Sequence, residues 1–270
     1  MITLPEFADK SKLIDYLIAN KSALIRQKKS ATKEADSVSY VIQFVDKDEA
    51  IKADMIPAEA TQIKVRSIIN TTKLFDSHGD VHFDQLWNKS LKDNKDNYLV
   101  KQHQFNFEGI ISDNVKAFTK QMTWHELGIN YEGKTQALIF DSIIDKSESP
   151  FMFEKYRTGK VKQHSVGMQY VKMELAVNDD RYEKEFATWE KYFEEIANKE
   201  EVLEEGFFWA ITEAKIIEGS AVVKGSNWAT PTTSIQQTKG QPGAPTDPTE
   251  PPKALKASEL IQNYNPLKHI

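Results

Sequence analysis

The feature that most constrains the fold is a series of short segments rich in β-branched and aromatic residues, several of them bounded by glycine, asparagine or aspartate. Such segments are typical of β-strands separated by turns. Strands are predicted at residues 37–45, 62–69, 109–118, 121–129, 136–144, 165–175 and 207–217. Helical patterns at residues 83–91, 149–156 and 181–203 interrupt them without regular alternation. We therefore expect an α+β fold: a mainly antiparallel, closed β-barrel of about seven strands with flanking helices.

The two ends of the chain differ from this predicted barrel. Residues 10–26 place apolar side chains at helical spacing and predict an amphipathic helix. Residues 238–252 contain five of the chain's ten prolines and no large apolar side chain, a composition typical of a linker. The predicted organisation is an N-terminal helical arm (1–35), a barrel domain (36–234), a Pro-rich linker (235–253) and a short C-terminal tail (254–270).

The helical segment 181–203 is predicted to be a charged insertion in the barrel domain. Its large apolar residues, Phe186, Trp189, Phe193 and Ile196, recur at helical spacing among many glutamates and lysines. This pattern indicates a helix that lays one face on the barrel. An exposed docking helix for a partner is the alternative.

The composition excludes several classes of function. The formal net charge of −5 gives no basic excess for a nucleic-acid backbone, so nucleic acid is not an expected partner. The absence of cysteine excludes disulfides, cysteine nucleophiles and thiolate metal sites, and it fits a cytosolic setting. No apolar run reaches the length that crosses a bilayer, so no membrane association is expected.

Three residues are candidates for chemistry, each with a structural alternative. His103 follows a short apolar run, at a strand end where a histidine can face a cleft or simply be solvated. Ser165 stands at a strand entrance, and Gly167 would leave room beside it for a substrate backbone, although a serine near glycine is often a turn residue. Glu218 lies between apolar residues and needs a partner, either a histidine ring or a lysine.

A metal site is a further possibility that the sequence raises. His78 and His82 stand four residues apart and, with Asp80, could hold zinc in a metallohydrolase. Gly79 and the preceding Asp-Ser turn signal favour a loop over a helix there, and the glutamate of the helical His-Glu-x-x-His motif is absent. We therefore expect neither a metal nor a cofactor.

Four motifs, taken in order, resemble those of the prohead maturation proteases of tailed bacteriophages, relatives of the herpesvirus capsid assembly proteases. Asp76-Ser-His-Gly-Asp80 is similar to the early Asp/Gly-Asp turn of this family, and Leu99-Val-Lys-Gln-His103 with Glu108-Gly109 to its apolar-x-x-His motif. Gly159-Lys-Val-Lys-Gln-His-Ser-Val-Gly-Met168 is similar to its nucleophile strand. Glu218-Gly-Ser-Ala-Val222 with Gly225-Ser-Asn227 is similar to its late Glu-x-Ser-x-Val block.

The resemblance covers about residues 38–231 and implies a serine protease. By position, His103 matches the catalytic base and Ser165 the nucleophile. The herpesvirus relatives use a second histidine after the serine, but here only His269 follows Ser165, and it lies in the tail. An acidic third member is therefore implied, and Glu218 is the residue we assign.

The resemblance also implies the setting and the substrates. The protease would act in the host bacterial cytoplasm, inside the assembling prohead, on scaffold, on the scaffolding segment of the major capsid protein and on itself. A homo-oligomer is compatible with this role. Because proteases cut exposed, unfolded chain, we expect self-cleavage between Ser234 and Ala254. The alternative is a non-catalytic structural or scaffolding protein of capsid assembly with the same fold.

Overall fold

The computed structural model describes residues 7, 9–32, 56, 58–223 and 232–237. The chain divides into two units, residues 1–238 and 239–270, and the second unit lies outside the described residues. The strand predicted at residues 37–45, most of the predicted linker and the predicted tail also lie outside them.

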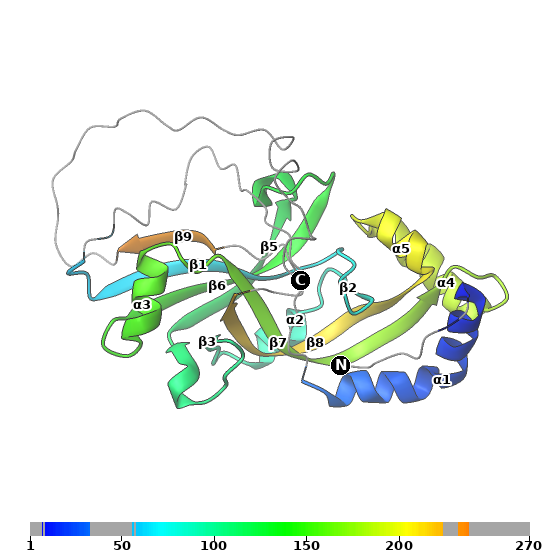
Figure 1. Ribbon diagram of the computed structural model, residues 1–270, viewed down its shortest axis with the longest axis horizontal. Coiled ribbons are helices and arrows are strands. Elements are labelled where there is room, and N and C mark those ends of the chain that lie inside the picture. The colour runs from blue at the N-terminus through cyan, green and yellow to red at the C-terminus, as the bar shows by residue number, and fades with distance from the viewer. Residues whose placement is uncertain (1–6, 8, 33–55, 57, 224–231, 238–270) are drawn as a thin grey trace, which may run out of the picture. The chain divides into compact units, whose positions relative to one another are not determined.

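The first of two sheets has the strand order β5-β6-β1-β9, and every neighbouring pair is antiparallel (Figure 1). Its strands are β1 (Gln62–Thr71), β5 (Val115–Thr123), β6 (Lys134–Asp145) and β9 (Thr232–Gln237). The predictions at residues 62–69 and 136–144 fall inside β1 and β6. Strand β9 extends to Gln237, past residue 235, where the linker is expected to begin.

The second sheet is built around β8 (Phe207–Val222), the longest strand among the described residues. Along one side of β8 run β2 (Asp80–His82) and β3 (Leu99–Lys101), both parallel to it, and β4 (Ile110–Ser112) pairs with β3. Strand β7 (Gln163–Val177) pairs antiparallel with β8 over almost its whole length. This long pairing brings the predicted nucleophile strand beside the strand that carries Glu218.

The predicted closed barrel is wrong, because neither described sheet closes. The first sheet ends at β5 and β9, and no strand pairing joins it to the second sheet within the described residues. The physical reason is that β8 is long enough to take different partners at its two ends, β2 near Ala210 and β3 near Ser220. An alternating pattern of apolar and polar residues is compatible with two packed sheets as well as with a barrel. The observed fold is α+β, with one open antiparallel sheet and one open mixed sheet.

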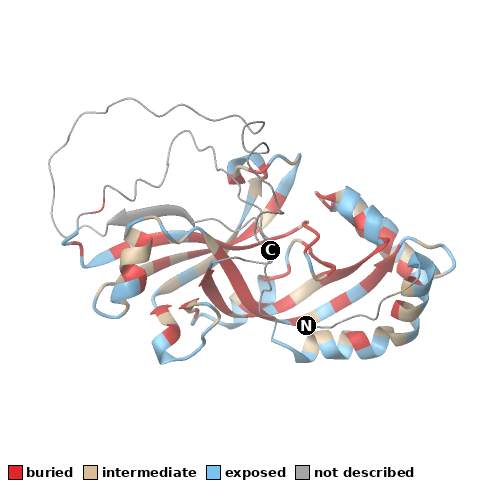
Figure 2. Cartoon of the chain, viewed as in Figure 1, coloured by how far each residue is buried: buried red, intermediate tan, exposed pale blue. Residues whose placement is uncertain are grey.

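The two sheets bury a common apolar core. Side chains of β1 and β6, such as Val65 and Phe140, belong to the same buried cluster as Met168 of β7 and Trp209 of β8. Figure 2 shows buried residues in red along much of β7 and β8. The approach is closest at Gly219, where an added Cβ would lie 2.6 Å from Phe140 Cε2. Glycine at this position therefore lets the β8 segment next to Glu218 pack against β6.

Helices α1, α2, α4 and α5 pack against the second sheet, and α3 packs against β1 and β6 of the first. Helix α1 (Lys10–Ser30) contains the predicted segment 10–26, and its Ile14, Leu17 and Leu24 are buried in the core shared with β7. Helix α2 (Asn88–Asp93) starts later than predicted, and α3 (Pro150–Arg157) matches the segment 149–156 closely. None of the helices in the described part of the chain is both long and apolar enough to cross a membrane.

The segment 181–203 forms three short elements, and a single helix is not observed. These are α4 (Glu183–Tyr192), the 3-10 helix η4 (Phe193–Glu195) and α5 (Lys199–Glu205). Trp189 and Ile196 are buried against Phe208 of β8, and Phe186 and Phe193 pack on the same cluster. The apolar stripe is therefore used to cover the sheet, which favours the packed helix over the docking helix.

Candidate functional site

The strand register determines which side chains around Ser165 share one face of the second sheet. Ser165 of β7 lies directly opposite Ser220 of β8, and Gly167 lies opposite Glu218. Directly opposed residues of an antiparallel pair project to the same face, and so do residues two apart along a strand. The side chains of Ser165, Ser220 and Glu218 therefore all project from the same face.

His103 reaches this face through a tight turn at the end of β3. Gln102 and His103 have φ values of 49° and 56°, and the N–H of Gln104 donates to the carbonyl of Lys101 at 2.9 Å. Positive φ at both central residues is the pattern of a type I′ turn, which asparagine and glycine normally occupy. The backbone N–H of His103 donates to Ser220 Oγ at 2.8 Å. The turn thus folds the histidine back over β8.

The imidazole of His103 pairs with Glu218, as expected from the sequence. The distance from His103 Nδ1 to Glu218 Oε1 is 2.7 Å, and the two side chains are only 10% and 3% exposed. An ionised carboxylate only accepts hydrogen bonds, so Nδ1 carries the proton and Nε2 is left as the basic nitrogen. Within the described residues, Nε2 has no hydrogen-bond partner, and Glu218 forms no ion pair with a lysine.

Gly167 makes room for this carboxylate. An added Cβ at Gly167 would lie 2.1 Å from Glu218 Oε1, the oxygen that binds His103. From the sequence, this space is expected to receive a substrate backbone beside Ser165. In the structure the Glu218 side chain occupies it, so any larger residue at position 167 must displace the carboxylate.

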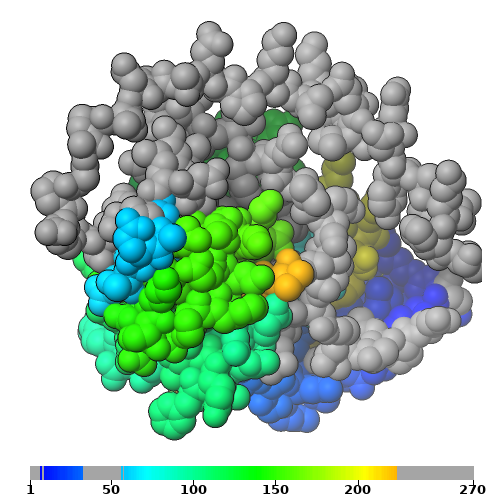
Figure 3. Space-filling model, turned by 60° about the vertical axis from the view of Figure 1, so that its left-hand side comes forward, coloured from blue at the N-terminus to red at the C-terminus, as the bar shows by residue number. Residues whose placement is uncertain are grey.

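The structure brings two of the three predicted residues into direct contact. His103 and Glu218 are hydrogen bonded, whereas Ser165 shares their face and forms no hydrogen bond with His103 Nε2 in the described part of the chain. Hydrogen bonds between a nucleophile and its base are often long until substrate binds. Figure 3 shows α3 and the start of β7 (bright green), the segment after β3 (blue-green) and the end of β8 (orange) together on one surface.

Two features of the site were not recognised in the sequence. One is the contact of Ser220 with the histidine turn: Ser220 belongs to the Glu-x-Ser-x-Val block, but the sequence assigns it no role, and it lies beyond the strand predicted at 207–217. On the opposite face of β7, His164 Nε2 is hydrogen bonded to the hydroxyl of Tyr156 on α3 at 2.8 Å, and both side chains are fully buried. Burial also raises the pKa of Tyr156, which keeps this phenol protonated. The hydrogen bond between His164 and Tyr156 holds the start of β7 to α3, on the face of the strand opposite Ser165.

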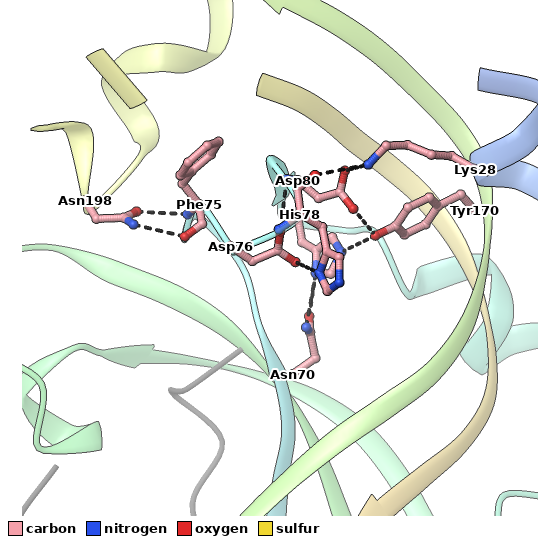
Figure 4. A network of polar contacts seen from close by, with 9 residues as sticks. Lys28, Asn70, Phe75, Asp76, His78, Asp80, Tyr170 and Asn198 are labelled. Atoms are coloured by element: carbon pink, nitrogen blue, oxygen red, sulfur yellow. Dashed lines mark hydrogen bonds and ion pairs between the residues drawn. The ribbon is translucent and has the colours of Figure 1, made fainter. Parts of the chain in front are cut away.

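The residues of the alternative metal site belong to a different polar network (Figure 4). Asp80 accepts hydrogen bonds from Lys28 Nζ at 2.5 Å and from the hydroxyl of Tyr170 at 2.8 Å, while His82 Nδ1 lies 3.1 Å from the amide nitrogen of Asn70. His78 Nδ1 lies 3.8 Å from Asp76. Across the described ranges, no group of three or more His, Asp or Glu side chains is arranged to hold a metal ion.

This network has a structural consequence, because it attaches α1 to β2 and β7. Lys28 comes from α1, and its side chain and that of Asp80 are 13% and 1% exposed. The Asp76-Ser-His-Gly-Asp80 turn presents Asp80 for this contact, since Asp76 Oδ1 accepts the N–H groups of both His78 and Asp80. The first motif of the resemblance therefore serves to fasten the helix.

We expect Lys28→Met to lower the free energy of unfolding by about 3 kcal/mol, because it leaves the carboxylate of Asp80 buried without its cation. Denaturant titration measures this change. The matched control is Lys172→Met, which removes the cation of a pair with Glu213 from a lysine whose side chain is 70% exposed and should cost less than about 1 kcal/mol. Equal losses in the two variants would contradict the fastening role.

No family model, curated protein or solved structure matches the chain.

Proposed function

We propose that the protein is a serine endopeptidase in which Ser165 is the nucleophile, His103 the general base and Glu218 the residue that orients His103. The observation that carries the proposal is the 2.7 Å hydrogen bond between His103 Nδ1 and Glu218, two residues 115 positions apart in the chain. Their pairing directs the basic Nε2 atom away from the carboxylate. This division of roles on one imidazole is what a serine nucleophile requires.

The proposed reaction has two halves, acylation of Ser165 and hydrolysis of the acyl-enzyme, and each of the three residues has a role in both. Ser165 Oγ attacks the carbonyl carbon of the scissile peptide while its proton passes to His103 Nε2. The C–N bond then breaks, His103 returns the proton to the leaving amine, and an acyl-enzyme remains on Ser165. A water molecule, deprotonated by the same nitrogen, attacks the acyl carbon, the ester bond to Ser165 Oγ breaks, and His103 returns the proton to Oγ as the acid product leaves. Glu218 stabilises the imidazolium that forms in each half.

The resemblance to prohead proteases supports a role in phage capsid maturation. The proposed substrates are scaffold, the scaffolding segment of the major capsid protein and the chain itself. The proposed self-cleavage between Ser234 and Ala254 includes residues outside the described part of the chain. Removal of scaffold would clear the capsid interior before DNA enters.

Co-expression with a major capsid protein and scaffold as candidate substrates tests this proposal. Wild type should convert at least one of these proteins to a shorter product that is identified by mass spectrometry, and His103→Ala should leave them intact. EDTA should have no effect on the conversion, because the proposed mechanism uses no metal. Intact substrates with the wild-type chain would instead favour the non-catalytic scaffolding role.

A further inference from the structure

Ser220 is a buried polar residue to which the proposed triad gives no role. Its side chain is fully buried, and it lies opposite Ser165 in the β7–β8 pairing. Ser220 Oγ accepts the backbone N–H of His103 at 2.8 Å, and its closest acceptor is the carbonyl of Val100 at 3.4 Å. The hydroxyl therefore connects β8 to the backbone of the proposed base.

The turn that Ser220 contacts is strained. Gln102 and His103 both have positive φ values, a conformation that costs a residue with a Cβ about 1–2 kcal/mol. Of the hydrogen bonds at the turn, three are donated by its own N–H groups: Gln104 N–H to Lys101 carbonyl, Gln102 N–H to Ala221 carbonyl and His103 N–H to Ser220 Oγ. Two of them join backbone groups that any sequence would supply. The third depends on a hydroxyl at position 220.

We propose that Ser220 is a positioning residue that holds the His103 backbone in the left-handed conformation and thereby keeps the imidazole in register with Glu218. This inference rests on the proposed function only for its effect on catalysis. Without the hydroxyl, the partly buried N–H of His103 loses its acceptor, and the turn is free to relax toward negative φ. Relaxation would carry Nδ1 away from Glu218 and change the direction of Nε2.

Two readouts on Ser220→Ala test the proposal. Proton NMR should show a downfield signal for His103 Nδ1–H, hydrogen bonded to Glu218, in the wild type, and this signal should be lost or broadened in the variant. The value of kcat should fall about 10- to 100-fold with KM nearly unchanged, because misplacement of the base affects the chemical step. The control is Ser142→Ala, which removes a fully buried hydroxyl that has no hydrogen-bond partner in the described residues, and it should leave both readouts unchanged.

A second substitution separates positioning from loss of folding. Asparagine tolerates positive φ better than glutamine does, and Gln102 is exposed, so Gln102→Asn should restore part of the signal and of kcat in the Ser220→Ala background. An unchanged NMR signal and unchanged kcat in Ser220→Ala would overturn the inference, and so would a failure of Gln102→Asn to restore either. If the wild type has no protease activity, the proposed function fails, but the NMR comparison still decides whether Ser220 positions the imidazole.

Discussion

Ser165→Ala is expected to abolish self-cleavage and the cleavage of capsid substrates, with a fall in rate of at least about 10⁴-fold. The substitution removes the atom that is proposed to form the acyl-enzyme and leaves the His103–Glu218 pair in place. Intact mass after expression measures the effect directly: the wild-type chain should lose a C-terminal fragment that begins between residues 235 and 254, and the variant should keep its full mass.

The same experiment needs a control for the effect of deleting a buried hydroxyl. Ser142→Ala serves for this purpose, because Ser142 is as deeply buried as the site residues but lies on β6 in the other sheet. It should show the wild-type mass. Continued cleavage by Ser165→Ala would remove Ser165 from the mechanism, whatever the geometry of His103.

Gly167→Ala is expected to have an effect almost as large, although it adds only a methyl group. The new Cβ would lie 2.1 Å from Glu218 Oε1, so the carboxylate must move, and we expect this movement to weaken its hydrogen bond to His103. A displacement of about 1 Å in a catalytic group can cost about 100-fold in rate. The measurement is kcat on a capsid-derived peptide that contains the mapped cleavage site.

A double substitution shows whether Gly167 acts through Glu218. If it does, Gly167→Ala combined with Glu218→Ala should be no slower than Glu218→Ala alone, because the added methyl group then has no carboxylate to displace. Additive losses would mean that Gly167 serves the substrate, as the sequence first suggests. Gly133→Ala is the control, since an added Cβ at this exposed turn meets no atom within 4 Å, and its strained φ of 90° affects local stability without touching the site.

The strands that carry the site could be predicted because their composition is unambiguous. The segments predicted at 165–175 and 207–217 lie within β7 and β8, which continue further at their ends. The prediction at 121–129 is wrong beyond Thr123, because the chain turns through a 3-10 helix, η3 (His125–Leu127), that Gly128 ends at a φ of 72°. An alternating pattern of apolar residues indicates which side chains face the core, but it does not indicate where a strand ends.

The closed barrel could not have been excluded from the sequence. Closure requires hydrogen bonds between the first and last strands of one sheet, and no local pattern records whether such bonds form. Here the strands divide between two sheets, and β8 takes β2 and β3 at its two ends. The first sheet is antiparallel throughout, whereas the second is mixed, because β2 and β3 run parallel to β8.

The contact between His103 and Glu218 could be anticipated from the sequence, but the turn and the glycine that allow this contact could not. The resemblance identifies His103, Ser165 and Glu218 as candidates, and the structure then places the first and third in contact. The left-handed turn at His103 was not foreseen, because glutamine and histidine are not turn-specific residues at such positions. The contact of Gly167 with Glu218 was also not foreseen, because Glu218 lies 51 residues later in the chain and only the pairing of β7 with β8 places it opposite Gly167.

Labelling with a fluorophosphonate tests the central claim most directly. If Ser165 is activated by His103, its Oγ should attack phosphorus, fluoride should leave, and one adduct should form on the peptide that contains Ser165, with loss of protease activity. Glu218→Ala and His103→Ala should label far more slowly, while the fully folded Ser142→Ala control should label at the wild-type rate. An adduct on a different residue, or labelling of Ser165 that is as fast without His103, would contradict the proposed catalytic arrangement.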